Sequence, residues 1–259
     1  MIPINHLYSN LKLDTSTIIP IFCLLVKTFC EFLQFIFLTY ASLCDTIILG
    51  DVTMKKNYQL ILDAELEKTA AMSRKPSLLL HACCAPCSSY VLEYLNKYFD
   101  ITVFFYNPNI SPKEEYEFRK SEIVRLISEI PHIGDIKFLT GEYCPEKFFD
   151  MAKGMENLPE GGERCFKCYR MRLDRCAEEA KNGSFDYFTT TLSISPHKNA
   201  QKLNEIGAEL SDKYGVKYLF SDFKKKNGYK RSCELSQEYN LYRQNYCGCV
   251  FSKKAAENR

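Results

Sequence analysis

The sequence predicts an α/β protein: a single Rossmann-like domain with a mostly parallel sheet of about five strands covered by helices, plus a small helical insertion. Three observations lead to this fold class. From residue 77 onward, short apolar runs alternate with helical patterns. These helical patterns are long enough to serve as right-handed crossovers between parallel strands. Finally, 259 residues with 46% hydrophobic and 25% charged content describe a globular chain with one sizeable core.

The first strand–helix units have the clearest pattern. Residues 77–81 have the sequence SLLLH, which is typical of a short buried strand, and a helical period follows over residues 88–99. Residues 101–106, ITVFFY, repeat the apolar run, and a long amphipathic helix is expected over 113–130 after a loop. A helix is also expected before the first strand, beginning at Tyr58.

The alternation continues toward the C-terminus. Further strands are expected over residues 136–140, 185–192 and 216–220, and further helices over 200–214 and 232–242. Residues 142–175 lack a strand pattern and form the expected helical insertion. Functional groups of open α/β sheets gather beyond the carboxyl ends of the strands, at a topological switch point. We therefore expect a site directly after the strand of residues 77–81.

The first 53 residues differ from the rest of the chain. Residues 16–50 are rich in apolar residues, but the runs between charges reach only about a dozen residues and Pro20 interrupts the first. A spanning helix needs roughly 18 to 20 apolar residues, so we expect no stable membrane association. Three interpretations stay open: an extension upstream of a start at Met54, outside a catalytic domain of residues 54–259; a weak membrane-associated segment; or a genuine part of the fold.

The charge balance is mildly positive once that extension is set aside. Residues 1–53 carry two of the 34 basic and four of the 32 acidic residues, which leaves 32 against 28 and a net charge of +4. A small positive excess permits a polyanionic partner without requiring one. Because no secretion signal is found and thiols are abundant, we expect a cytoplasmic protein whose cysteines bind metals or do catalysis.

Seven of the thirteen cysteines fall into three tight groups. The groups are Cys83, Cys84 and Cys87; Cys165 and Cys168; and Cys247 and Cys249. A hydrophobic core rarely needs thiols at this density, so the grouping indicates metal or redox chemistry. The first group directly follows the first expected strand, and the second has CxxC spacing at the start of an expected helix, where the helix N-terminus lowers thiol pKa.

The first two groups offer four thiolates to a structural zinc ion or to a [4Fe–4S] cluster. An adjacent pair such as Cys83 and Cys84 gives no loop to wrap a zinc ion, so the spacing favours iron and sulfur. The alternative is that these cysteines are small buried hydrophobic residues. Cys87, one helical turn further on, is either a spare ligand or a residue packed into the helix.

Cys247 and Cys249 form a different kind of pair. Gly248 lets the backbone turn freely between them, so the two thiols can close a small, strained disulfide. Strained disulfides are the easily reduced, catalytic ones. The alternative is that these thiols are extra metal ligands or inert surface groups.

Five sequence blocks, in order and with the expected spacing, resemble the QueH family of epoxyqueuosine reductases over about residues 54–254. The blocks are HACCAPCSSY at 81–90, FYNPNI at 105–110, RCFKCYRMRL at 164–173, TTTLSISPHKN at 189–199 and YRQNYCGC at 242–249. The resemblance implies reduction of epoxyqueuosine at the wobble position of tRNA to queuosine, the last step of tRNA queuosine biosynthesis. An electron donor, unidentified from the sequence, is implied as well.

The resemblance also implies roles for individual cysteines. Cys83, Cys84, Cys165 and Cys168 would hold a [4Fe–4S] cluster, and Cys247 and Cys249 would form a redox-active disulfide. For Cys87, the resemblance implies contact with one additional iron near the cluster. Residues 1–53 depart from the family pattern, which favours a start at Met54.

Other residues have weaker assignments. His81 and His197 are the candidates to protonate the departing epoxide oxygen, although a lone histidine at a strand end is more often structural. Residues 224–231 interleave Tyr229 with five cations and could grip tRNA phosphates, or form a solvated loop. Residues 106–112 could line a base pocket or form a tight turn.

Two other functional classes fit the sequence less well. A nucleotide-binding enzyme of the tRNA-thiolating type needs a Ser-Gly-Gly-rich phosphate loop after the first strand, where this chain has Cys-Cys-Ala-Pro-Cys. A zinc-stabilised RNA-binding module has no use for the CxC pair.

Overall fold

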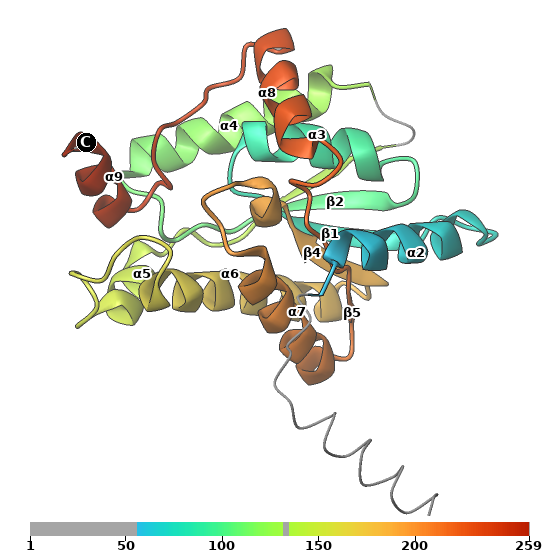
Figure 1. Cartoon of the computed structure of the whole chain (residues 1–259), viewed down its shortest axis with the longest axis horizontal. Helices are drawn as coiled ribbons and strands as arrows, with labels where there is room; N and C mark the ends of the chain where they lie inside the picture. The colour runs from blue at the N-terminus through green and yellow to red at the C-terminus, as the bar shows by residue number, and fades with distance from the viewer. Residues whose placement is uncertain (1–55, 132–134, 259) are drawn as a thin grey trace, which may run out of the picture. The chain divides into compact units, whose positions relative to one another are not determined.

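The centre of the computed structural model, which describes residues 56–131 and 135–258, is a five-stranded sheet with the order β3-β2-β1-β4-β5 (Figure 1). The strands are β1 (Ser77–His81), β2 (Asp100–Phe105), β3 (Lys137–Thr140), β4 (Tyr187–Thr190) and β5 (Lys217–Tyr218). Every neighbouring pair is parallel. The predicted α/β fold with a parallel sheet is therefore confirmed. The expected extension of residues 1–53 and the start at Met54 lie outside the described residues.

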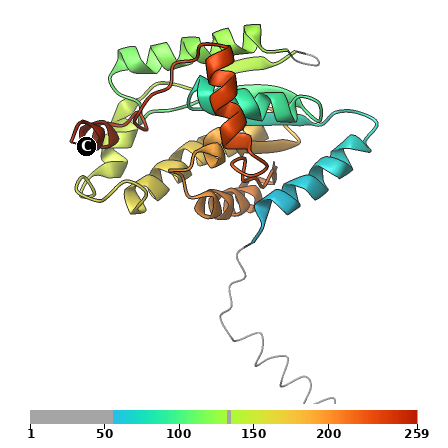
Figure 2. The same ribbon diagram turned by 45° about the horizontal axis from the view of Figure 1, so that its top comes forward.

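Helices cover both faces of this sheet. They are α2 (Tyr58–Ala70), α3 (Ala85–Leu95), α4 (Lys113–Glu129), α5 (Pro145–Ala152), α6 (Glu163–Asn182), α7 (Ala200–Tyr214), α8 (Gly228–Glu238) and α9 (Val250–Glu257), with a 3₁₀ turn η1 (Thr191–Ile194). Helices α3, α4 and α8 lie on one side of the sheet and α6 and α7 on the other (Figures 1 and 2). None of the helices in the described ranges is long and apolar enough to span a bilayer.

The central strand β1 shows why both faces need cover. Leu78 and Leu80 pack into the core on the side of α3 and α4, whereas Leu79 packs into the core on the side of α6 and α7. All three leucines are fully buried, as expected for a parallel sheet whose side chains alternate between two covered faces.

The helical segment expected over residues 142–175 contains α5 and the first part of α6. Helix α6 continues to Asn182 and packs Leu173 and Ala177 into the sheet core. It is therefore the crossover helix that leads from β3 back to β4, and it carries the CxxC pair in its first two turns. Helix α9, after the CxC pair, was not expected from the sequence.

The sheet topology places a crevice beside β1. The chain proceeds from β1 outward to β2 and β3, and from β4 outward to β5, so the strand order reverses between β1 and β4. Loops leaving the carboxyl ends of these two strands diverge and open a binding site between them. The loop after β1 carries Cys83 and Cys84, which confirms the expected position of the first cysteine group.

Candidate functional site

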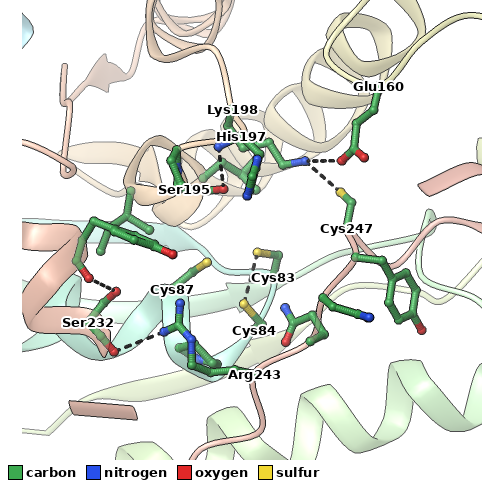
Figure 3. Close-up of a pocket in the computed structure, with 18 of the residues that line it drawn as sticks. Cys83, Cys84, Cys87, Glu160, Ser195, His197, Lys198, Ser232, Arg243 and Cys247 are labelled. Carbon is green, nitrogen blue, oxygen red and sulfur yellow. Dashed lines mark hydrogen bonds and ion pairs between the residues drawn. The ribbon is translucent and has the colours of Figure 1, made fainter. Parts of the chain in front are cut away.

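A cavity of about 200 Å³ opens at this switch point, and we call it the main cavity (Figure 3). Its walls come from the loop after β1 with the start of α3, the segment after β4, helices α6 and α8, the loop before α6, and the segment that precedes α9. The wall residues include the sulfurs of the first cysteine group together with Cys247. Segments far apart in the chain thus meet around the thiols.

The first cysteine group is held by the start of α3. Cys84 has extended backbone dihedrals and is the N-cap, and Pro86 occupies the first turn, where a missing N–H costs nothing. The sulfurs of Cys83, Cys84 and Cys87 all lie within 4.8 Å of one another, with Cys83 Sγ 3.8 Å from Cys84 Sγ. No other set of three potential metal ligands is this close within the described ranges. The structure thus places Cys87 with the pair as a third sulfur donor.

Neighbouring thiols within this group affect each other's ionisation. Hydrogen bonds from Cys83 and Cys87 lower the pKa of Cys84, whereas the pKa of Cys87 is raised. The hydrogen bond to Cys84 raises the pKa of Cys83 to about 12. One sulfur of the group therefore carries negative charge more readily than its neighbours.

The second cysteine group lines a separate, smaller cavity of about 20 Å³, which we call the small cavity. Cys165 Sγ accepts a hydrogen bond from the Gly161 N–H at 3.3 Å, while burial raises the pKa of Cys168 to about 11. Cys247 and Cys249 line the same cavity. The structure therefore brings the CxxC and CxC pairs together, and among the cysteines that it describes only Cys247 lines both cavities.

The CxC pair has two different thiol environments. Lys198 Nζ lies 3.1 Å from Cys247 Sγ and 3.6 Å from Glu160 (Figure 3). Burial acts against ionisation of Cys247, but the charges of Lys198 and Arg172 outweigh it and lower its pKa. Burial instead raises the pKa of Cys249 to about 12. Both residues are free thiols in this structure.

The backbone between these thiols is held by contacts with α4 and the loop before it. Gly248 has φ +110, a conformation that L side chains rarely adopt, and its carbonyl accepts a hydrogen bond from the Ser111 N–H at 3.0 Å. Arg119 Nη1 donates to the carbonyl of Cys247 at 3.2 Å. The CxC loop is therefore anchored on residues far away in the sequence.

Arg172 was not singled out from the sequence, although it lies on the wall of both cavities. Its guanidinium is fully buried in helix α6, and its Nη2 has no hydrogen-bond partner among the described residues. The buried side-chain atoms Asn109 Oδ1 and Nδ2 and Tyr169 Oη, which belong to walls of the small cavity, also lack partners there. The spacing of Arg172, four residues after Cys168, was the signal that could have placed it on the same helix face.

The two candidate histidines have different positions. His81 is fully buried, with Nδ1 2.9 Å from Thr190 Oγ1 and Nε2 3.1 Å from the carbonyl of Tyr106. Burial lowers the pKa of His81 to about 3, with Arg172 adding to the effect. It is a neutral structural residue and not part of either cavity wall. His197 does line the main cavity and is the remaining histidine candidate.

The cationic segment of residues 224–231 is partly neutralised. Lys224 lies 2.8 Å from Asp222, Lys226 lies 2.7 Å from Asp63, and Arg231 lies 2.6 Å from Glu93. Lys225 and Lys230 are exposed and have no acidic partner within the described part of the chain. Only these two of the five cations are therefore available to a phosphate without first breaking an ion pair.

Residues 106–112 do not line the main cavity. Asn107 instead donates to the carbonyl of Ala82 at 2.8 Å and accepts from Arg172 at 3.3 Å. Asn109 reaches the small cavity. Through Asn107, this loop contacts Ala82 and Arg172, and of its two predicted roles the base pocket does not agree with its absence from the wall of the main cavity.

A family model described as Epoxyqueuosine reductase QueH matches residues 78–255, a range that contains all three cysteine groups. The chain belongs to the QueH family. The family member from Streptococcus pyogenes is 46% identical over 202 residues, covering 77% of this chain and 79% of that protein. The Staphylococcus epidermidis member is 45% identical over 76% of this chain and 85% of its own length, and the Thermotoga maritima member is 38% identical over 68% and 90%. All three are named epoxyqueuosine reductase QueH, an oxidoreductase.

Proposed function

We propose that this protein reduces the epoxide of epoxyqueuosine, at the wobble position of tRNA, to the alkene of queuosine. The single observation that supports this best is the position of Cys247, which lines both the cavity of the first cysteine group and the cavity of the CxxC pair. Together with Cys249, Cys247 would store two electrons beside both sets of sulfur ligands, which matches the two electrons that removal of the epoxide oxygen consumes. Membership of the QueH family supports the same substrate.

The residues around these cavities are chemically suited to a [4Fe–4S] cluster. Cys83, Cys84, Cys165 and Cys168 would hold it, since thiolates are the ligands that iron–sulfur clusters use. Unpartnered polar atoms of Arg172, Asn109 and Tyr169 are available to hydrogen-bond to an anionic sulfur site. When bound, the cluster would supply one-electron transfer. Cys87, whose sulfur lies beside those of Cys83 and Cys84, is the natural ligand for one additional iron.

The electron and proton balance gives the CxC pair its role. Converting an epoxide to an alkene breaks two C–O bonds, consumes two electrons and two protons, and releases water. Closing an S–S bond between Cys247 and Cys249 releases two electrons. An external electron donor must then reopen the disulfide, and its identity is open to experiment.

The two protons that the reaction consumes can come from groups beside the CxC pair. Cys249 keeps its thiol proton at neutral pH because burial raises its pKa, so disulfide closure releases that proton. Lys198 Nζ holds a second proton 3.1 Å from Cys247 Sγ. His197 and Lys198 both line the main cavity, so either can face the departing oxygen.

The deciding experiment is an anaerobic assay with the purified full-length chain. The substrate is tRNA from cells that lack the final reduction step, the artificial reductant is dithionite with a viologen mediator, and queuosine is scored by nucleoside mass spectrometry. Iron and acid-labile sulfide are measured on the same preparation. Absence of queuosine from a protein with a full cluster would overturn the proposed reaction, and a colourless protein containing only zinc would overturn the cofactor.

A further inference from the structure

Arg172 differs from the other fully or largely buried arginines of the described chain. Arg119 has Glu115 at 2.7 Å, and Arg164 donates to three backbone carbonyls at 2.7 to 2.9 Å. Arg172 is 1% exposed, yet no carboxylate forms an ion pair with it within the described residues. Its partners are two neutral oxygens, the carbonyl of Cys168 and Asn107 Oδ1, both at 3.3 Å.

A buried cation without a counter-charge is strongly destabilising, because its lost hydration is not replaced. A guanidinium has five N–H donors, and those on Nη2 have no acceptor among the described residues. An anion close to Arg172 would remove both costs. The walls that Arg172 shares identify the source of that anion. Cys83 and Cys247 line the main cavity with Arg172, and Cys168 lines the small cavity with it, so each cysteine group contributes a sulfur.

We infer that Arg172 is the built-in counter-cation of the anionic sulfur site and raises the reduction potential of the cluster. The inference rests on the proposed cluster. The potential of an iron–sulfur centre depends on net charge, on hydrogen bonds to sulfur and on solvent exposure. Arg172 supplies a fixed positive charge and unpartnered N–H donors in a position closed to water.

The surroundings of Arg172 keep its guanidinium in place. Asn107 Oδ1 accepts a hydrogen bond from Arg172 Nη1. The Nδ2 of the same amide donates at 2.8 Å to the carbonyl of Ala82, the residue directly before Cys83. One amide thus joins Arg172 to the loop of the first cysteine group. Arg172 is a positioning residue, because it acts through the sulfurs and their bound group.

The test compares Arg172→Gln, which removes the charge, with Arg172→Lys, which keeps it. Arg175→Gln is the matched control, since Arg175 lies on the same helix and pairs with Glu178 and Glu179 outside both cavities. The readouts are circular dichroism, iron and sulfide content, and a one-electron redox titration followed by electron paramagnetic resonance. None of these depends on turnover.

We expect R172Q to lower the ratio of reduced to oxidised cluster about tenfold at the wild-type midpoint, which corresponds to about 59 mV for one electron. R172K should shift the ratio less and R175Q should leave it unchanged. A folded R172Q that loads no iron while R172K loads it would also support the counter-cation role. A fully loaded R172Q with an unchanged midpoint would overturn the inference, and so would unfolding of both Arg172 variants. If the wild-type protein itself takes up no iron, the proposed function fails first, which separates the two failures.

Discussion

Lys198 Nζ lies 3.1 Å from Cys247 Sγ, across a separation of 49 residues in the chain. Lys198 is 9% exposed, and its Nζ also lies 3.6 Å from the carboxylate of Glu160. Glu160, Lys198 and the sulfur of Cys247 therefore form a short row in which the lysine is the central, positive group. This row makes the two thiols of the CxC pair unequal. Because the pKa of Cys247 is lowered and that of Cys249 is raised, Cys247 loses its proton more readily than Cys249.

Removing the lysine charge should make Cys247 less reactive. The thiolate is the nucleophile, and its fraction falls as pH drops through the pKa that Lys198 and Arg172 hold down. In K198M the pKa of Cys247 rises, so alkylation by iodoacetamide at pH 7 should slow by about tenfold, the effect of a shift of about one unit. Peptide mass spectrometry of the reduced, metal-free protein measures this at Cys247 alone. K202M, which changes a half-exposed lysine in the first turn of α7, should react like the wild type; equal rates in K198M would contradict the assignment.

Loss of the partner thiol should separate cluster binding from turnover. C249S keeps Cys83, Cys84, Cys165 and Cys168, so iron and sulfide content should match the wild type. It cannot close the disulfide, so queuosine formation should fall by at least about a hundredfold, within the range that removal of a catalytic group commonly produces. C233S, on α8, is the control and should stay active. Full activity in C249S would remove the CxC pair from the mechanism.

Gly248 should be required for two reasons: its positive φ, and the lack of space for a Cβ atom beside Arg119 and Ile110. A Cβ on Gly248 would lie 2.9 Å from Arg119 Nη1 and 3.0 Å from Ile110, and the residue has φ +110. G154A provides a matched control, because Gly154 has φ +78 but nothing within 4 Å of the position that its Cβ would take. Both variants should lose about 1 kcal/mol of unfolding free energy from the backbone strain, with a larger loss in G248A. Denaturant melts check this, and equal losses would mean that Arg119 moves aside freely.

Within the 224–231 segment, only Lys225 and Lys230 should contribute to tRNA binding. The double variant K225A/K230A should weaken binding and reduce the salt slope by up to about 0.9 for each phosphate that is no longer neutralised. Filter binding at several salt concentrations with unmodified tRNA measures both quantities. K181A, an exposed lysine at the far end of α6, is the control. An unchanged slope in the double variant would exclude this segment from the tRNA interface.

The sequence by itself determined the parts of this protein that depend on local pattern. Alternation in β1 predicts a strand buried on both faces, because successive side chains point to opposite sides. The spacing of Cys83, Cys84 and Cys87 predicts that their sulfurs lie near one another, since residues one helical turn apart share a face, and the structure brings the three within 4.8 Å. The strand-to-helix order places the first group at the switch point.

Only the tertiary structure decides which candidate side chains are neutral, which are already paired with an opposite charge and which are left without one. His81 is neutral because the fold buries it between Thr190 and the backbone of Tyr106, and Lys226 is paired because Asp63 of α2 faces it. Arg172 gains a role only in the folded chain, where it shares cavity walls with Cys83, Cys168 and Cys247. Ionisation depends on desolvation and on charges that are close in space. Those neighbours come from distant parts of the chain, and no periodicity or spacing encodes them.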